Sequence, residues 1–153
     1  MTSKLFFYPL PLYDVLEITG KTGTDNISFT ASGIAIAGDT ENNLCIKAYR
    51  LLKKEYPQLP PVDMYLHKTI PAGAGLGGGS ADGAFTLKLL NDTFQLNLST
   101  AELMKYAAQL GSDCPFFISN TPGFATGRGD ILEPINVDLG NYKFVFDQSR
   151  YIG

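Results

Sequence analysis

The pattern of hydrophobic and polar positions predicts short strands interspersed with helices. Apolar runs at Val15–Ile18 and Asn26–Thr30 are typical of strands, and a turn rich in Gly, Thr and Asp separates them. Between residues 62 and 67, Val, Met and Leu alternate with Asp, Tyr and His, as in a half-buried strand. This third strand runs directly into a glycine-rich segment.

Three segments have the periodicity of amphipathic helices. Thr40–Tyr56 places its leucines on one face and stops before a proline, and Ser80–Phe94 has a similar apolar face. The third helix follows a capping box with Ser99 at the N-cap and Glu102 at N3, and Gly111 suits its end. We therefore expect three helices.

The remaining apolar runs, at Phe116–Ile118, Phe124–Thr126 and Tyr142–Phe146, are short and strand-like, with a turn at Asn120–Gly123. Strands and helices joined by hairpin-length connections predict an α+β fold, with a mostly antiparallel sheet packed on helices.

Composition narrows the classes of function. The formal net charge is −3 over 153 residues, which argues against a general nucleic-acid binder. Cys45 and Cys114 lie far apart in a chain with one histidine, so we interpret them as reduced core residues. The apolar start is broken by Pro9 and Pro11, and no segment has the length of a membrane span. These features predict a cytoplasmic protein with no membrane partner.

The glycine-rich segment is the strongest candidate for a functional site. It consists of Pro71, Ala72, Gly73, Ala74, Gly75, Leu76, Gly77, Gly78, Gly79, Ser80 and Ala81. Glycines let backbone N–H groups converge, and the helix that follows adds its positive N-terminal end, so the segment predicts a polyphosphate site. Ser80 could cap that helix, or bind phosphate or its metal ion. The alternative is a tight turn without a ligand, which needs one or two glycines and not five.

Two familiar phosphate loops fit poorly. The spacing of Gly73, Gly75 and Gly78 matches the dinucleotide fingerprint, but the acidic residue expected about 20 positions later is missing. A Walker A loop ends in Gly-Lys-Ser/Thr, and this loop contains no lysine.

The pattern Pro-x-x-x-Gly-Leu-Gly-x-x-Ser-Ala resembles the phosphate loop of the GHMP kinase superfamily. Gly-Ser-Asp-Cys-Pro at 111–115 and Ala-x-Gly-x-Gly at 125–129 are similar to the 4-diphosphocytidyl-2-C-methylerythritol kinase family within it. This resemblance implies an N-terminal domain of the ribosomal protein S5 domain 2-like fold. It also implies ATP and Mg²⁺ as cofactors, and transfer of phosphate to a cytidine diphosphate ester of methylerythritol in the non-mevalonate isoprenoid pathway.

The resemblance also assigns roles to individual residues. Asp113 corresponds to the family's catalytic aspartate, which orients or deprotonates the substrate hydroxyl. Lys68 and Asn43 fall where the family contacts the nucleotide. The structural alternatives are a turn or cap aspartate, a surface lysine and a helix-start cap. The metal ligands stay open.

The resemblance is incomplete at both ends. Family members open with a strand carrying a catalytic lysine and then a Gly-Tyr-His segment, and this chain shows neither. We therefore expect an ATP-binding domain at 1–146 that lacks the opening strand, a tail at 147–153, and no C-terminal kinase domain. Such a chain should be nearly inactive alone, and an exposed sheet edge could promote self-association.

Three other functions stay open. The chain could be a homoserine- or mevalonate-type GHMP kinase, or a catalytically dead nucleotide-binding remnant that serves as an interaction module. Nucleic-acid binding would rest on analogy with the S5-like fold alone.

Overall fold

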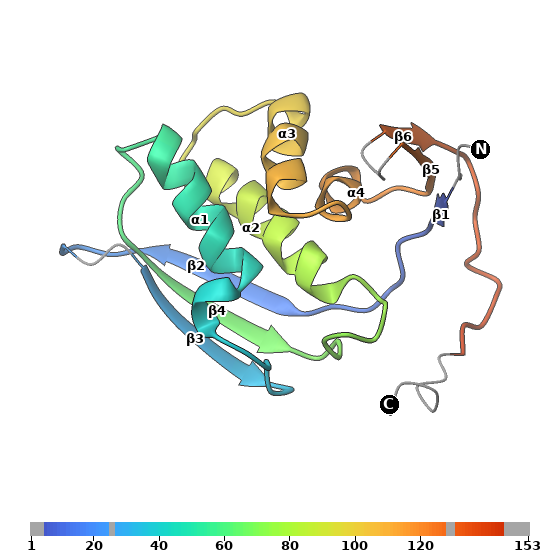
Figure 1. The fold of residues 1–153 in the computed structure, drawn as a ribbon, viewed down its shortest axis with the longest axis horizontal. Helices are drawn as coiled ribbons and strands as arrows, with labels where there is room; N and C mark the ends of the chain where they lie inside the picture. Colours follow the sequence, from blue (N-terminus) through green and yellow to red (C-terminus); the bar gives the residue numbers. More distant parts are fainter. Residues whose placement is uncertain (1–4, 25–26, 128–130, 146–153) are drawn as a thin grey trace.

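The computed structural model describes residues 5–24, 27–127 and 131–145. Strands and helices are interspersed along the chain, largely as the pattern predicts (Figure 1). In order, the elements are β1 (Leu5–Phe7), β2 (Val15–Gly20), β3 (Ile27–Gly33), the 3-10 helix η1 (Thr40–Asn42), α1 (Leu44–Glu55), β4 (Val62–Lys68), α2 (Gly78–Thr93), α3 (Thr100–Leu110), α4 (Cys114–Ser119), β5 (Gly123–Thr126) and β6 (Ile131–Pro134).

The strands form two three-stranded sheets rather than one. In the larger sheet, β4 lies between β2 and β3, antiparallel to β2 and parallel to β3. In the smaller sheet, β5 lies between β1 and β6 and is antiparallel to both. Three of these four pairings are antiparallel, which agrees with the predicted preference.

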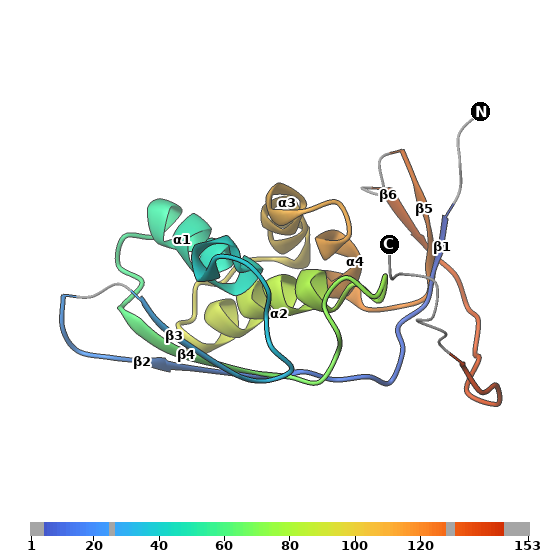
Figure 2. The same cartoon turned by 60° about the horizontal axis from the view of Figure 1, so that its bottom comes forward.

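Helices α1 and α2 cover one face of the larger sheet, α3 packs against these two helices and α4, and the smaller sheet stands at one end of the molecule beside α4 (Figures 1 and 2). The alternation in β4 explains this layering, because Val62, Met64 and Leu66 are buried under the helices while Asp63 and Tyr65 are exposed. No helix in the described part of the chain is long and apolar enough to cross a membrane.

The helix starts follow their capping residues. The capping box of α3 is confirmed, with hydrogen bonds in both directions between Ser99 and Glu102. Helix α1 begins at Leu44, after the separate turn η1, because the Asn43 side chain accepts a hydrogen bond from the Cys45 N–H at 2.8 Å. Helix α2 begins at Gly78 rather than Ser80, and its N-cap is Gly77.

Two strand predictions at the C-terminal side are wrong. Phe116–Ile118 lies in the short helix α4, because Pro115 suits a first helical turn and a short apolar run has no decisive period. Residues 142–145 contain no strand, and Phe146 lies outside the described residues. Strands β1 and β6 escaped prediction, since each is only three or four residues long.

Candidate active site

The glycine loop connects the end of β4 to the start of α2, and the fold itself requires four of its five glycines. Gly73, Gly75 and Gly77 have φ angles of 76°, 74° and 70°, a left-handed region that glycine enters without steric cost. Gly78 has no room for a side chain, because a Cβ there would lie 2.9 Å from Ile70 Cγ2.

Gly79 is different, because the fold gives no reason for a glycine there. Its φ is not positive, and a Cβ added at this position would meet no described atom within 4 Å apart from its chain neighbours and the nearby backbone of its own helix. It is exposed in the first turn of α2, where backbone N–H groups have no partner within the helix. A bare backbone at this position suits a ligand that approaches closely, above all an anion.

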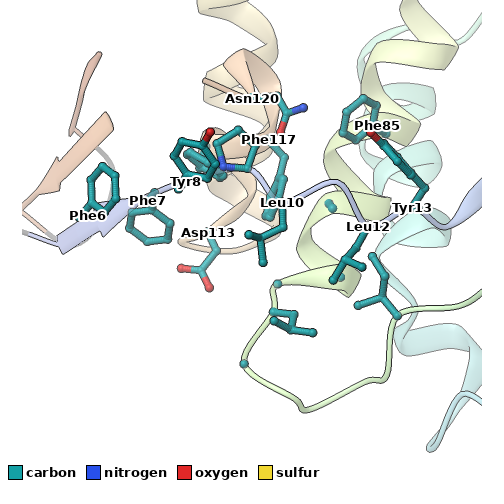
Figure 3. A pocket seen from close by; sticks show the side chains of 18 residues that line it. Phe6, Phe7, Tyr8, Leu10, Leu12, Tyr13, Phe85, Asp113, Phe117 and Asn120 are labelled. Carbon is teal, nitrogen blue, oxygen red and sulfur yellow. The ribbon is translucent and has the colours of Figure 1, made fainter. Parts of the chain in front are cut away.

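The loop borders a largely apolar cavity of about 420 Å³. Its backbone from Gly75 to Gly78 forms one wall, and aromatic rings that include Phe7, Phe85 and Phe117 form others (Figure 3). Asp113 is the acidic side chain among the described residues that line this cavity. The structure thus brings Gly75–Gly78 and Ala81 of the predicted phosphate loop and the predicted catalytic aspartate to one cavity, although more than 30 residues separate them in the chain. The other loop residues, Gly79 and Ser80 among them, do not line this cavity.

Asp113 occupies the N-cap position of α4, yet its side chain makes no capping hydrogen bond with the amides of that helix. The Ser112 hydroxyl donates to Asp113 Oδ1 at 3.3 Å, and the carboxylate is exposed toward the cavity. Phe116 in the same helix packs on Phe7 of β1, with ring centroids 5.1 Å apart, and so holds α4 at the cavity wall. This arrangement leaves the carboxylate able to accept a hydrogen bond from a hydroxyl group.

Lys68 is not the surface lysine that the sequence left as an alternative. Its side chain is 5% exposed, and Nζ lies 2.5 Å from Asp14 Oδ2 and 2.8 Å from Asp82 Oδ2. It does not appear among the described residues that line the cavity. Direct contact of Lys68 with ATP stays a prediction.

Asp14 and Asp82 escaped sequence analysis, because no motif links them to Lys68. The three side chains come from the linker before β2, from α2 and from β4. Burial alone would lower the pKa of Lys68, but its hydrogen bonds to the two carboxylates raise the pKa above its ordinary value. Burial raises the pKa of Asp82 to about 6, although its bond to Lys68 acts in the opposite direction.

The two other polar candidates occupy structural positions. Asn43 caps α1, as its structural alternative predicted, and its contact with a nucleotide stays a prediction. Ser80 lies in the first turn of α2, half-buried, and is not the cap. Burial raises the pKa of the Cys114 thiol, while a hydrogen bond with Ser80 acts in the opposite direction. Binding of phosphate or metal by Ser80 stays a prediction.

The comparisons with known proteins agree with this geometry. The GHMP kinases N terminal domain matches residues 43–121, a range that contains the glycine loop and Asp113. A curated 4-diphosphocytidyl-2-C-methyl-D-erythritol kinase of Bacteroides fragilis is 54% identical over 140 residues, which cover 91% of this chain and 51% of that protein. A relative of the same name from Chlorobium phaeobacteroides is 40% identical over 139 residues, covering 90% of this chain and 46% of that protein.

Solved structures extend the comparison. A crystal structure of 4-(cytidine 5'-diphospho)-2C-methyl-D-erythritol kinase superposes with a TM-score of 0.74 at 30% identity, covering 88% of this chain and 46% of that one. A D-glycero-D-manno-heptose 1-phosphate kinase from Bacteroides thetaiotaomicron shares the fold, with a TM-score of 0.69 at 18% identity over 90% of this chain and 52% of that one.

The chain spans about half the length of the curated relatives it matches. Within that span, the two-layer arrangement of helices on the larger sheet and the glycine loop before α2 are those of a GHMP N-terminal domain, as the sequence predicts. The chain belongs to the GHMP kinase family.

Proposed function

We propose that this chain is the nucleotide-binding part of an ATP-dependent kinase that phosphorylates 4-diphosphocytidyl-2-C-methyl-D-erythritol. The observation that carries the proposal is the shared cavity, which Asp113 lines together with residues 75–78 of the glycine loop. The substrate is proposed from the names of relatives that are 40% and 54% identical to this chain, and from the 30% identical solved structure.

The glycine loop would bind the phosphates of ATP. The N–H groups of the first turn of α2 lack partners within the helix, and the helix dipole places partial positive charge at this end. Gly79 keeps the approach to these N–H groups open. Phosphoryl transfer depends mainly on positioning and on stabilisation of charge, which a loop of this kind supplies.

Asp113 would act on the acceptor. Its carboxylate can accept a hydrogen bond from the substrate hydroxyl and so orient or deprotonate it for attack on the γ-phosphorus. The cavity holds the reacting groups near one another, which favours in-line transfer.

Mg²⁺ would be held chiefly by the phosphates of ATP. No group of three or more His, Cys, Asp or Glu side chains in the described part of the chain could hold a metal by itself. Mg²⁺ often takes few protein ligands and several phosphate or water oxygens. Ser80, in the first turn of α2, fits as an oxygen ligand or a phosphate donor. When bound, the ion would neutralise phosphate charge.

The isolated chain should bind ATP but transfer phosphate slowly, because it spans about half the length of the relatives that are named for the activity.

We also propose a cytoplasmic location and weak self-association through β1. This strand lies at the edge of its sheet, and its Leu5 and Phe6 are 56% and 45% exposed. Size-exclusion chromatography at several concentrations tests the association, which predicts an earlier elution volume at high concentration. A volume independent of concentration would contradict it.

The experiment for the function is an ATP-consumption assay on the isolated chain and on a chain extended to the length of the relatives. We expect turnover with 4-diphosphocytidyl-2-C-methyl-D-erythritol in the extended chain, and very little in the isolated one. Turnover with homoserine or mevalonate instead would reassign the substrate. ATP binding without turnover in the extended chain would favour the catalytically dead remnant.

A further inference from the structure

The buried cluster of Asp14, Lys68 and Asp82 holds the two ends of the glycine loop. At the entry, Asp14 Oδ1 accepts hydrogen bonds from the N–H groups of Thr69 at 2.6 Å and Ile70 at 2.9 Å. The Thr69 hydroxyl also donates to the Tyr13 carbonyl. The linker before β2 is therefore attached to the backbone just ahead of the loop.

At the exit, the same cluster reaches the first turns of α2. Lys68 Nζ bonds to Asp82 Oδ2 at 2.8 Å, just over one turn into the helix, while it also bonds to Asp14. A Cβ on Gly78 would lie 3.4 Å from Lys68 Nζ, so the ammonium sits directly beneath the start of the helix. One side chain thus connects both ends of the loop.

Stability alone is a weak reason for this arrangement. The three side chains are between 4% and 9% exposed, and burying two carboxylates around one ammonium carries a large desolvation penalty. Apolar residues of similar volume often stabilise a fold as well or better, whereas a buried ionic group can select one conformation. The loop between the two ends contains three left-handed glycines, so its own backbone restricts it little.

We infer that Asp14, Lys68 and Asp82 are positioning residues that fix the separation of the two ends of the loop, and with it the conformation in which the loop binds the phosphates of ATP. The inference deepens the proposed function and rests on it for the identity of the ligand. Lys68 acts through the loop backbone in this arrangement and needs no contact with the nucleotide.

The test is the double variant Lys68→Gln/Asp82→Asn, which removes one positive and one negative charge and leaves the Asp14 bonds to Thr69 and Ile70 in place. The matched control is Lys21→Gln/Asp63→Asn, which removes a partly exposed ion pair of 3.3 Å at the opposite end of the larger sheet. For each protein we would measure the ATP dissociation constant, the urea unfolding midpoint and the amide NMR signals of Gly77, Gly78 and Gly79.

We expect the Lys68/Asp82 variant to bind ATP at least tenfold more weakly and to shift the three glycine signals, with the control unchanged in both. Should the variant not fold, Asp14→Asn/Lys68→Met/Asp82→Leu removes all three charges, while an amide oxygen at position 14 can still accept from the Thr69 and Ile70 N–H groups, and it is expected to fold with the same loss of affinity. A folded variant with unchanged affinity and unchanged glycine signals would overturn the inference. Absence of ATP binding by the unmodified chain would overturn the proposed function. The positioning role is tested separately, by comparing the three glycine signals of the variant and the unmodified chain in the absence of ATP.

Discussion

The ring of Phe117 lies against the backbone of Gly77, so close that a Cβ on Gly77 would be 3.0 Å from the ring atom Cζ. Phe117 belongs to α4, the helix that begins after Asp113, and Gly77 is the N-cap of α2. The contact therefore joins the helix that carries the proposed catalytic carboxylate to the loop that would bind the phosphates. We therefore expect it to help hold the two halves of the site at a fixed distance.

Replacing Phe117 with Leu should disturb this distance. We expect turnover in a chain extended to the length of the relatives to fall about tenfold or more, because small misplacements of reacting groups are costly, while ATP affinity changes little. The matched control is Phe94→Leu, since Phe94 packs on Gly20 in the same way at the far end of α2. Equal losses of turnover in both variants would show that the effect is one of general packing.

The variant Gly79→Ala distinguishes an effect on ATP binding from an effect on stability. Because the new Cβ meets no described atom and the backbone is helical, unfolding free energy should stay constant or rise by up to about 1 kcal/mol. ATP affinity should fall about tenfold, roughly 1.4 kcal/mol, because the methyl group obstructs the phosphates. Isothermal titration and urea unfolding measure the two quantities.

The comparison variant is Gly78→Ala, which should lose stability as well, since its Cβ would lie 2.9 Å from Ile70 Cγ2. Valine at Gly77 or Gly78 would be a poor probe of binding for the same reason, because both positions are confined or left-handed. An alanine at Gly79 that left ATP affinity unchanged would argue against an anion at this turn.

How far the sequence predicts this protein depends on the length of each signal. The capping box at Ser99 is a specific local signal, and the alternation in β4 extends over several residues, so both predict their elements well. The run Phe116–Ile118 is only three residues long and has no clear period, and the proline before it favours the first turn of a helix. Division into two sheets depends on pairings such as Phe6 with Phe124, which no local pattern encodes.

The site likewise combines residues with strong local sequence patterns and residues with none. Glycine density in one segment predicts the loop, and the resemblance of a short motif predicts Asp113. Residues 75–78 of the loop line one cavity with Asp113, while the roles of these residues stay predictions. The cluster around Lys68 could not be predicted from the sequence, because its partner Asp14 lies 54 residues away in the chain. Asp82 is closer to Lys68 in the sequence, but nothing in the sequence distinguishes it from a solvent-exposed polar residue of a helix.

Stability should depend on pH through Asp82. Because burial raises the pKa of Asp82 to about 6, the folded state holds more protons than the unfolded state between about pH 4 and 6. This group's contribution to stability is therefore greatest below about pH 4 and declines as pH rises through 6. In Asp82→Asn the decline is absent, so the variant's unfolding free energy should gain on the unmodified chain from pH 4 to 7, by about 1.4 kcal/mol per unit of pKa shift.

Urea unfolding at several pH values checks this expectation. Asp14 has a lowered pKa despite its burial, because Lys68 and the Thr69 and Ile70 amides bond to it, and its contribution is lost as pH falls in both proteins. A difference between the proteins that stays constant from pH 4 to 7 would contradict the assignment of the titration to Asp82.

Asp113→Asn tests the acceptor chemistry. In the extended chain, turnover should fall on the order of 10²-fold or more, the usual scale for a positioned acid–base group. ATP affinity and the urea midpoint should be unchanged, because the side chain makes no capping hydrogen bond with α4. The control is Asp92→Asn, an exposed residue near the end of α2. Unchanged turnover would show that Asp113 has no part in catalysis and is only a turn residue.

The proposed function depends above all on binding of the ATP phosphates at the start of α2. Titration of the 153-residue chain with ATP and Mg²⁺, followed by the amide NMR signals of the loop glycines, tests it most directly. We predict saturable shifts centred on Gly77, Gly78 and Gly79, with little change at Gly20, which lies in β2 beside the far end of α2. Loop signals that stay constant at millimolar ATP would show that this loop does not bind the nucleotide.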